Sequence, residues 1–132
     1  MYSKEIYPLS EALGKQCIAN GYFLVTAESC TGGLLAQSIT DIPGSSLWFD
    51  RGFVTYSNES KIDCLEINPL TLETYGAVSQ ETANEMAFGA IANGSGNLSI
   101  SISGVAGPDG GSKSKPVGTV FFAISNKKSI IY

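Results

Sequence analysis

A short run near the amino end of the chain, Tyr22–Ala27 (YFLVTA), constrains the fold more than any other segment. β-Branched and aromatic residues dominate this run, which is typical of a strand. The run is mostly apolar on both faces, whereas a strand with one face in water alternates apolar and polar residues. We therefore expect this strand to lie in a sheet that helices cover on both sides.

Helical and strand patterns alternate along the rest of the chain. Leu9, Leu13 and Cys17 repeat at helical spacing and predict a helix over residues 9–19, which Asn20-Gly21 ends. Other helices are predicted from residue 32 or 33 to about 40, over 59–65, from 69 to a stop at 76, and from an N-cap at 79 to about 92. Strands are predicted over 51–56, 98–103 and 117–124, and loops over 41–46, 93–96 and 104–116. The alternation of helices and strands predicts a layered α/β domain. The last two strands are expected to pair like a hairpin, so the sheet should be mixed.

The length and composition fit one globular domain. The chain has 132 residues, of which 43% are hydrophobic, so it can bury a core without disulfides or metals. No run of about eighteen apolar residues occurs, and no membrane span is expected. The first residues, MYSKEIYPLS, lack the long apolar segment of a secretion signal, so we expect a cytoplasmic protein with reduced cysteines.

The charge balance argues against nucleic acid as a partner. The net charge is −4 and Arg51 is the single arginine, so the sequence has no basic stripe that would bind a phosphate backbone. The lysines that lie close together late in the chain are interpreted as solvated surface residues: Lys113, Lys115, Lys127 and Lys128. A small anionic ligand is still compatible with the sequence, because a few backbone donors and one cation can hold a single phosphate.

The sequence contains no histidine, which narrows the chemistry that the chain can perform. Ser-His-Asp and Cys-His mechanisms are excluded, as are zinc sites that depend on imidazole. The three cysteines, Cys17, Cys30 and Cys64, are too few and too scattered for a four-ligand zinc site, so neither a metal nor another cofactor is expected. A nucleophile would have to be activated by a lysine, a carboxylate or a tyrosine, and Ser-Lys is the known arrangement of this kind.

The segment Thr26–Ile39 (TAESCTGGLLAQSI) is the first candidate site. The predicted strand brings the polar residues ESCT to the carboxyl end of the sheet, where open α/β sheets bind ligands. The two glycines that follow let backbone amides approach a ligand, and the next helix points its positive end there. The alternative is a turn in which Ser29 or Thr31 only caps the helix. A buried Glu28 would need partners, and either Lys61 or an amide of the ligand is expected to supply them.

Two further segments carry polar residues next to predicted strands. Gly44–Lys61 (GSSLWFDRGFVTYSNESK) places two serines, a tyrosine and a lysine around the second strand. Lys61 could act as a base only if desolvation or another cation lowers its pKa, and the alternative is an exposed helix lysine. Ser103–Ser112 (SGVAGPDGGS) follows the third strand but lacks the spacing of dinucleotide and triphosphate loops, so a plain glycine-rich turn is its alternative. Together, the three segments predict a pocket at one edge of the sheet.

Four stretches resemble the C-terminal domain family of the competence/damage-inducible protein CinA: TAESCTGG, GSSLWFDRGFVTYSNESK, YGAVSQETANEMA and SISGVAGPDGGSKSKPVGTV. The similarity covers residues 5–125 in order, and it is strongest to the stand-alone amidases of the family. It implies a three-layer α/β/α domain that hydrolyses nicotinamide mononucleotide to nicotinate mononucleotide and ammonia, a step of pyridine nucleotide salvage that needs no metal. The partner implied is a small-molecule nucleotide.

The end of the chain departs from the family pattern. Family members continue after the last predicted strand with another strand and a helix that carry a Gly-Asp-Arg sequence and a later arginine, whereas this chain stops at KKSIIY. We therefore expect a single domain over residues 1–132 without that strand and helix. Exposed apolar surface, a homo-oligomer, or a weak or inactive nucleotide-binding domain would each be a consequence.

The resemblance also implies roles for particular residues. Lys61 is expected to be the base, with Tyr56 relaying a proton or orienting Lys61. Ser46 is preferred as the nucleophile, because Ser29 and Thr31 lie where a helix terminus suits an anion, and Ser29 is the alternative. The amides of SCTGG would then hold the phosphate or the oxyanion. The residues expected to bind or surround the substrate are Glu28, Cys30, Thr31, Gly32, Gly33, Ser45, Arg51, Gly104, Ala106 and Gly107.

Overall fold

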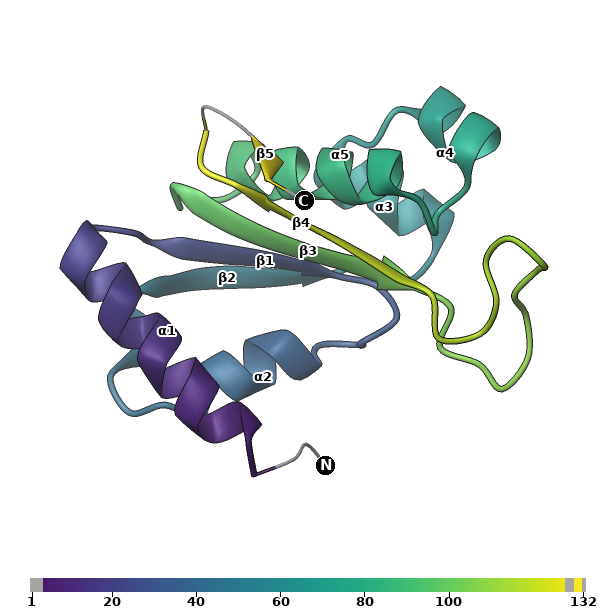
Figure 1. Cartoon of the computed structure of the whole chain (residues 1–132). Coiled ribbons are helices and arrows are strands. Elements are labelled where there is room, and N and C mark those ends of the chain that lie inside the picture. Colours follow the sequence, from purple (N-terminus) through teal and green to yellow (C-terminus); the bar gives the residue numbers. More distant parts are fainter. Residues whose placement is uncertain (1–3, 128–129, 132) are drawn as a thin grey trace.

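The computed structural model describes residues 4–127 and the backbone of residues 130–131, and in this part of the chain a mixed sheet of five strands forms the centre of the molecule (Figure 1). The strand order is β2-β1-β3-β4-β5. The parallel strands are β1 (Leu24–Glu28), β2 (Phe49–Val54) and β3 (Leu98–Gly104). β4 (Val120–Ser125) runs antiparallel to β3, and β5 (Ile130–Ile131) antiparallel to β4. The predicted mixed sheet and the hairpin-like pairing of the later strands are thereby confirmed.

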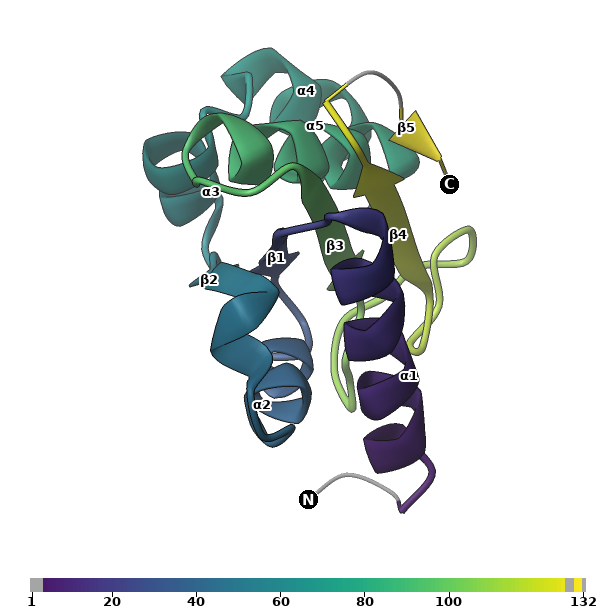
Figure 2. The same ribbon diagram turned by 90° about the vertical axis from the view of Figure 1, so that its left-hand side faces the viewer.

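Helices cover both faces of this sheet. α1 (Ile6–Asn20) and α2 (Leu34–Thr40) lie on one face (Figure 1 and Figure 2). The other face carries α3 (Asn58–Leu65), α4 (Pro69–Tyr75) and α5 (Gln80–Ala92). All 5 residues of β1 are buried, as the apolar pattern of this strand predicted. The three-layer α/β/α architecture is therefore confirmed.

Some element boundaries differ from those predicted. α1 starts at Ile6 rather than at residue 9, with Pro8 in its first turn, where the backbone nitrogen needs no helical partner. β4 starts at Val120 rather than at residue 117, because Gly118 (φ 92°) turns the chain before the strand can begin. The predicted loop over residues 41–46 holds the start of a short 3₁₀ helix, η1 (Ser45–Leu47).

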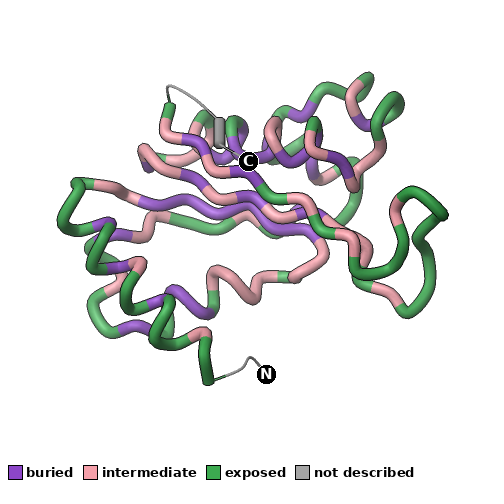
Figure 3. Tube along the Cα trace, viewed as in Figure 1, coloured by how far each residue is buried: buried purple, intermediate pink, exposed green. Residues whose placement is uncertain are grey.

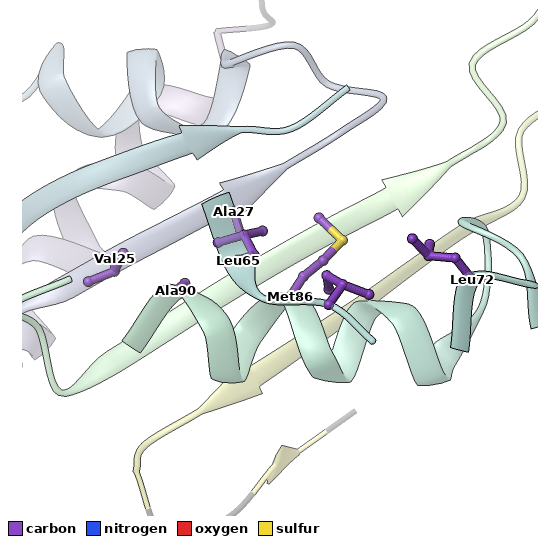
Figure 4. Close-up of a cluster of buried hydrophobic side chains, with 7 residues drawn as sticks. Val25, Ala27, Leu65, Leu72, Met86 and Ala90 are labelled. Atoms are coloured by element: carbon purple, nitrogen blue, oxygen red, sulfur yellow. The ribbon is translucent and has the colours of Figure 1, made fainter. Parts of the chain in front are cut away.

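An apolar cluster lies on each face of the sheet. On the α5 face, the buried members are Val25, Ala27, Leu65, Ile67, Leu72, Met86 and Ala90 (Figure 4). On the α1 face, the buried members are Cys17, Leu24, Ile39, Ile42 and Trp48. Buried positions therefore run along the middle strands and the inner sides of the helices (Figure 3). These two clusters hold α2 and α3 against opposite faces of the sheet.

The α5 side of β3 is polar but hydrogen-bonded. Ser99, Ser101 and Ser103 are buried, and their hydroxyls donate to the backbone carbonyls of residues 87, 83 and 77 at 2.7, 2.6 and 2.8 Å. A buried hydroxyl is costly unless it has such a partner. The three contacts therefore fix the position of β3 relative to α5 and the segment before it.

Part of the α1 side of the sheet stays exposed. Leu9 on α1 is 69% exposed, and Val120 and Phe122 on β4 are 48% and 56% exposed. A groove of about 300 Å³ runs between α1 and α2, with Ile102 of β3 among its lining residues. The exposed apolar surface that we expected is therefore present in the described part of the chain.

Gly89 is buried where α5 passes α3, and a methyl group there would overlap the backbone carbonyl of Leu65. Helix propensity alone would make Gly89→Ala more stable by about 1 kcal/mol. We expect the overlap to reverse this sign and to lower the free energy of unfolding by about 1–3 kcal/mol. Urea unfolding followed by circular dichroism measures the change. A variant as stable as the wild type would contradict the tight packing of α5 on α3.

Candidate active site

The turn between β1 and α2 carries Ser29. This residue follows β1 directly at the carboxyl edge of the sheet, and it is 7% exposed. Its backbone amide donates to the carbonyl of Ile102 on β3 at 2.9 Å, and its carbonyl accepts from the amide of Gly32 at 3.1 Å. Backbone hydrogen bonds therefore fix Ser29 on both sides.

Lys61 meets Ser29 from α3, the helix that follows β2. The helix begins after its N-cap Ser57, and Lys61 on its inner side is 0% exposed. The Nζ atom of Lys61 lies 3.0 Å from Oγ of Ser29. It also lies 2.7 Å from the carbonyl oxygen of Thr55 and 3.3 Å from that of Tyr56. The amine is therefore enclosed by one hydroxyl and two carbonyls.

The three neighbours of Lys61 Nζ are all oxygen atoms that can accept a hydrogen bond. Nζ donates to Oγ of Ser29 and to the carbonyls of Thr55 and Tyr56. Burial lowers the pKa of Lys61, against the opposite effect of the nearby Cys30 thiol. Within the described residues, no carboxylate forms a salt bridge with this lysine. Burial without a carboxylate partner therefore makes the charged form of Lys61 less favourable than it is for an exposed lysine.

We expected either Lys61 or a ligand amide to be the partner of Glu28. Its carboxylate instead binds groups of the turn and of α2. Its Oε1 accepts hydrogen bonds from the Thr31 hydroxyl at 2.6 Å and from the amide of Leu35 at 2.8 Å, and its Oε2 accepts from the amide of Ala36 at 3.0 Å. The buried carboxylate is thus satisfied by the turn and by the first turn of α2. Neither a lysine nor a ligand amide is needed to explain its burial.

These contacts also change the expected role of the α2 N-terminus. We expected Ser29 or Thr31 to cap the helix, or the turn amides to hold an anion there. The N-cap of α2 is Gly33 (φ 108°), with no side-chain cap of its own, and the carboxylate of Glu28 binds the first helical amides instead. The positive end of α2 therefore already faces a negative charge supplied by the protein.

The loop after β3 reaches the same edge of the sheet. A Cβ atom on Gly104 would come within 3.1 Å of Cys30 Sγ, so the thiol lies against the Gly104 backbone. Cys30 is half-buried, and burial raises the pKa of its thiol. Further along the loop, Ala106 is exposed and Gly107 lies against Val117. The third segment therefore reaches the edge where Ser29 lies, and Lys61 at the end of the second segment lies there too. The start of the second segment does not.

Ser46 lies at the opposite edge of the sheet. It is exposed in η1, which precedes β2, and the carbonyl of Trp48 just after η1 accepts from the amide of Leu24 at the start of β1 (2.8 Å). The expected contact between Ser46 and Lys61 is therefore wrong. Ser45 lies in the same short helix and is equally remote from the lysine.

Arg51 is also remote from Lys61. It pairs with Val25 near the amino end of β1, and its guanidinium forms a 2.7 Å salt bridge with Asp50. The same guanidinium donates to the carbonyl of Asn93 and the hydroxyl of Ser95, both at 3.3 Å. Because these two residues precede β3, Arg51 holds a loop at the amino edge of the sheet, away from Lys61.

Backbone groups complete the site and carry no signal in the sequence. The backbone carbonyl of Tyr56 accepts a hydrogen bond from Lys61 Nζ. We expected the phenol of Tyr56 to act instead, and this residue is 71% exposed. The carbonyls of Thr55 and Ile102 were missed entirely, because any residue type supplies a carbonyl. Their positions follow only from the pairing of the strands.

The described residues contain neither a metal cluster nor a membrane span. No group of three or more cysteine, aspartate and glutamate side chains there could hold a metal ion. No helix in that part of the chain is both long enough and apolar enough to cross a membrane. Cys17, Cys30 and Cys64 are free thiols.

Known proteins share this fold and much of this sequence. The crystal structure of the competence/damage inducible protein CihA from Agrobacterium tumefaciens has a TM-score of 0.95 and 42% identity, covering 99% of this chain and 80% of that chain. A CinA superfamily protein from Escherichia coli has a TM-score of 0.92 and 38% identity, covering 99% and 77%. The nicotinamide-nucleotide amidohydrolase PncC of Escherichia coli strain K12 is 52% identical over 128 residues, which are 97% of this chain and 78% of the relative. The family model of the CinA C-terminal domain matches residues 6–132. This chain belongs to the CinA C-terminal domain family.

Proposed function

We propose that this chain hydrolyses the carboxamide of nicotinamide mononucleotide to give nicotinate mononucleotide and ammonia, with Ser29 as the nucleophile and Lys61 as the base. The relative that is 52% identical carries the name nicotinamide-nucleotide amidohydrolase, which supports this substrate. The observation that carries the mechanism is the 3.0 Å distance between Ser29 Oγ and the fully buried Nζ of Lys61. In a chain without histidine, this dyad of Ser29 and Lys61 is a means of activating a hydroxyl.

The first half of the reaction forms an acyl-enzyme. The Ser29 proton passes to the neutral amine of Lys61 while Oγ bonds to the carboxamide carbon, giving a tetrahedral intermediate with a negative oxygen. The ammonium of Lys61 then returns the proton to the leaving nitrogen. The C–N bond breaks, ammonia departs, and the acyl group of nicotinate mononucleotide is left as an ester on Ser29.

The second half restores the enzyme. A water molecule gives a proton to Lys61 and attacks the ester carbon, and the proton then passes to Oγ as the C–O bond to Ser29 breaks. The products are nicotinate mononucleotide and free Ser29. Lys61 thus serves as base and then as acid in each half, which requires that its pKa be low enough for both protonation states to form.

The amides of the turn are suited to stabilise the negative oxygen of the intermediate. The amides of Cys30 and Thr31 directly follow the nucleophile and interact with the Cys30 thiol, and within the described residues no backbone carbonyl accepts from them. Amides held in a fixed turn can stabilise such an oxygen without reorganising. We propose that Gly32, Gly33 and Gly104 form the wall of the substrate site. Ser45, Ser46 and Arg51 lie at the other edge of the sheet and are not part of it.

We propose that the enzyme works in the cytoplasm, in pyridine nucleotide salvage, as one domain over residues 1–132. We also propose that it self-associates, and the exposed side chains of Leu9, Val120 and Phe122 support this. Sedimentation velocity over a range of protein concentrations distinguishes a monomer from an oligomer.

Ammonia release tests the proposed activity. We expect the protein to convert nicotinamide mononucleotide to nicotinate mononucleotide with one ammonia per product, as measured by chromatography and an enzyme-coupled ammonia assay. Nicotinamide riboside, which lacks the phosphate, serves as the comparison and should react more slowly. Tight binding of the nucleotide in calorimetry without ammonia would instead favour a binding domain without turnover.

The rate should rise with pH, because the base must be unprotonated. Burial lowers the pKa of Lys61, so the neutral amine is present at lower pH than it would be for an exposed lysine, whose pKa is about 10.4. We therefore expect kcat/KM to increase with pH and to reach half of its plateau below about pH 10.4. Initial rates in overlapping buffers measure the midpoint. A midpoint at or above the ordinary lysine value would contradict the buried, neutral base.

A further inference from the structure

We propose that Glu28 is a positioning residue that sets the geometry of the dyad of Ser29 and Lys61. The inference rests on the proposed function and adds a residue to it. Glu28 is 0% exposed, and both of its carboxylate oxygens are hydrogen-bonded within the protein. It therefore acts through other groups rather than by touching the substrate.

The side chain of Glu28 fixes the turn that carries Ser29. From the end of β1, its carboxylate reaches across the turn to the Thr31 hydroxyl and to the amides of Leu35 and Ala36 in α2. The side chain of Glu28 thus ties the start of the turn to Thr31 and to the beginning of α2. Ser29 is the first residue inside this closure, so the direction of its hydroxyl depends on these contacts.

The backbone of Glu28 fixes the segment that holds Lys61. The carbonyl of Glu28 accepts from the amide of Thr55 at 2.8 Å, and the carbonyl of Thr55 accepts from Lys61 Nζ at 2.7 Å. The amide and the carbonyl of the same residue, Thr55, therefore make the Glu28 contact and the lysine contact. Glu28 is linked to Ser29 by a covalent bond and to Lys61 through Thr55.

The partners of Glu28 also keep its charge away from the base. A buried carboxylate is stable only with donors or an opposite charge, and an ion pair with Lys61 would have kept that amine protonated. The amides and positive end of α2 supply the donors instead. We therefore expect Glu28 to affect the position of Ser29 without setting the pKa of Lys61.

Glu28→Gln tests this role with almost no change in size. A glutamine has a single accepting oxygen, and its NH₂ group would face one of the N–H or O–H donors that now bind the carboxylate. We expect the turn to shift and kcat to fall about tenfold or more, because small displacements of a nucleophile are costly, while KM changes by less than about twofold. The pH midpoint of the activity should stay that of the wild type.

A second readout does not depend on the proposed substrate. A fluorophosphonate reacts with an activated serine: Oγ bonds to phosphorus, fluoride leaves, and the hydroxyl proton passes to the base. We expect the labelling rate of Ser29, followed by mass spectrometry, to fall about tenfold or more in Glu28→Gln. Wild-type protein that is labelled at Ser29 but releases no ammonia would contradict the proposed substrate and leave the positioning role to be judged by the labelling rates.

Two variants keep the test decisive. Glu85→Gln is the matched control, because Oε1 of Glu85 accepts from the backbone amide of Asn68 at 2.9 Å, away from the dyad, and its labelling rate should be that of the wild type. Thr31→Val removes one donor of Glu28 and should give a smaller decrease even if Glu28→Gln fails to fold. If Glu28→Gln folds and is labelled at the wild-type rate, the inference is overturned. If Glu28→Gln does not fold, labelling of Thr31→Val at the wild-type rate overturns it. An equal loss in Glu85→Gln, or a pH midpoint moved to that of an exposed lysine, would overturn it as well.

Discussion

Replacing Ser29 by alanine is expected to lower kcat for ammonia release by about 10³-fold or more, because the variant lacks the hydroxyl that forms the acyl-enzyme. The backbone contact of residue 29 with the Ile102 carbonyl does not involve the side chain, so the turn should be preserved. The residual rate should come from binding and from the turn amides alone. Steady-state rates at saturating nucleotide measure the effect.

Ser46→Ala is the matched control for this prediction. It removes the same group from an exposed position in η1, at the opposite edge of the sheet from Lys61. We expect its kcat to stay within about twofold of the wild type, as is usual for surface substitutions away from a site. A large loss in Ser46→Ala together with an active Ser29→Ala would return the nucleophile to Ser46 and contradict the present assignment.

Lys61→Met is expected to lower kcat by about 10³–10⁴-fold, because it removes the base while roughly keeping the volume of the buried side chain. Lys61→Arg should lose as much activity, since a guanidinium keeps its charge but cannot be deprotonated in a protein. The two variants together separate a proton-transfer role from a purely electrostatic one. Melting temperatures, measured alongside, identify any loss that is caused by unfolding.

Lys15→Met is the matched control for Lys61→Met. Lys15→Met removes an exposed amine from α1 and should leave kcat unchanged. Activity in Lys61→Arg within about tenfold of the wild type would mean that a positive charge is sufficient at this position, and that outcome is incompatible with a base.

The layered fold was predictable because its signals are local. Tyr22–Ala27 is apolar on both faces, and the structure buries every residue of β1. The paired turns and caps around Ser79 and Gly76 also mark helix ends that the structure confirms. The start of β4 was missed by three residues, because the positive φ of Gly118 depends on how the long loop returns to the sheet.

The nucleophile was harder to choose, and strand direction explains the error. Ser46 precedes β2 and Lys61 follows it, so the two residues lie at opposite edges of a parallel pair of strands. Ser29 follows β1 and therefore shares an edge with Lys61. This rule could have been applied to the sequence itself. Ser29 was only the alternative because a helix terminus suits an anion from the ligand, a place that Glu28 takes.

The most direct measurement is the mass of the protein quenched in acid during turnover of nicotinamide mononucleotide. We expect a population that is heavier by one nicotinate mononucleotide acyl group, and after digestion this mass should lie on the peptide that contains Ser29. An acyl group on the peptide with Ser46, or ammonia release with no acylated protein at any quench time, would contradict the transfer of the Ser29 proton to Lys61 as the start of the reaction.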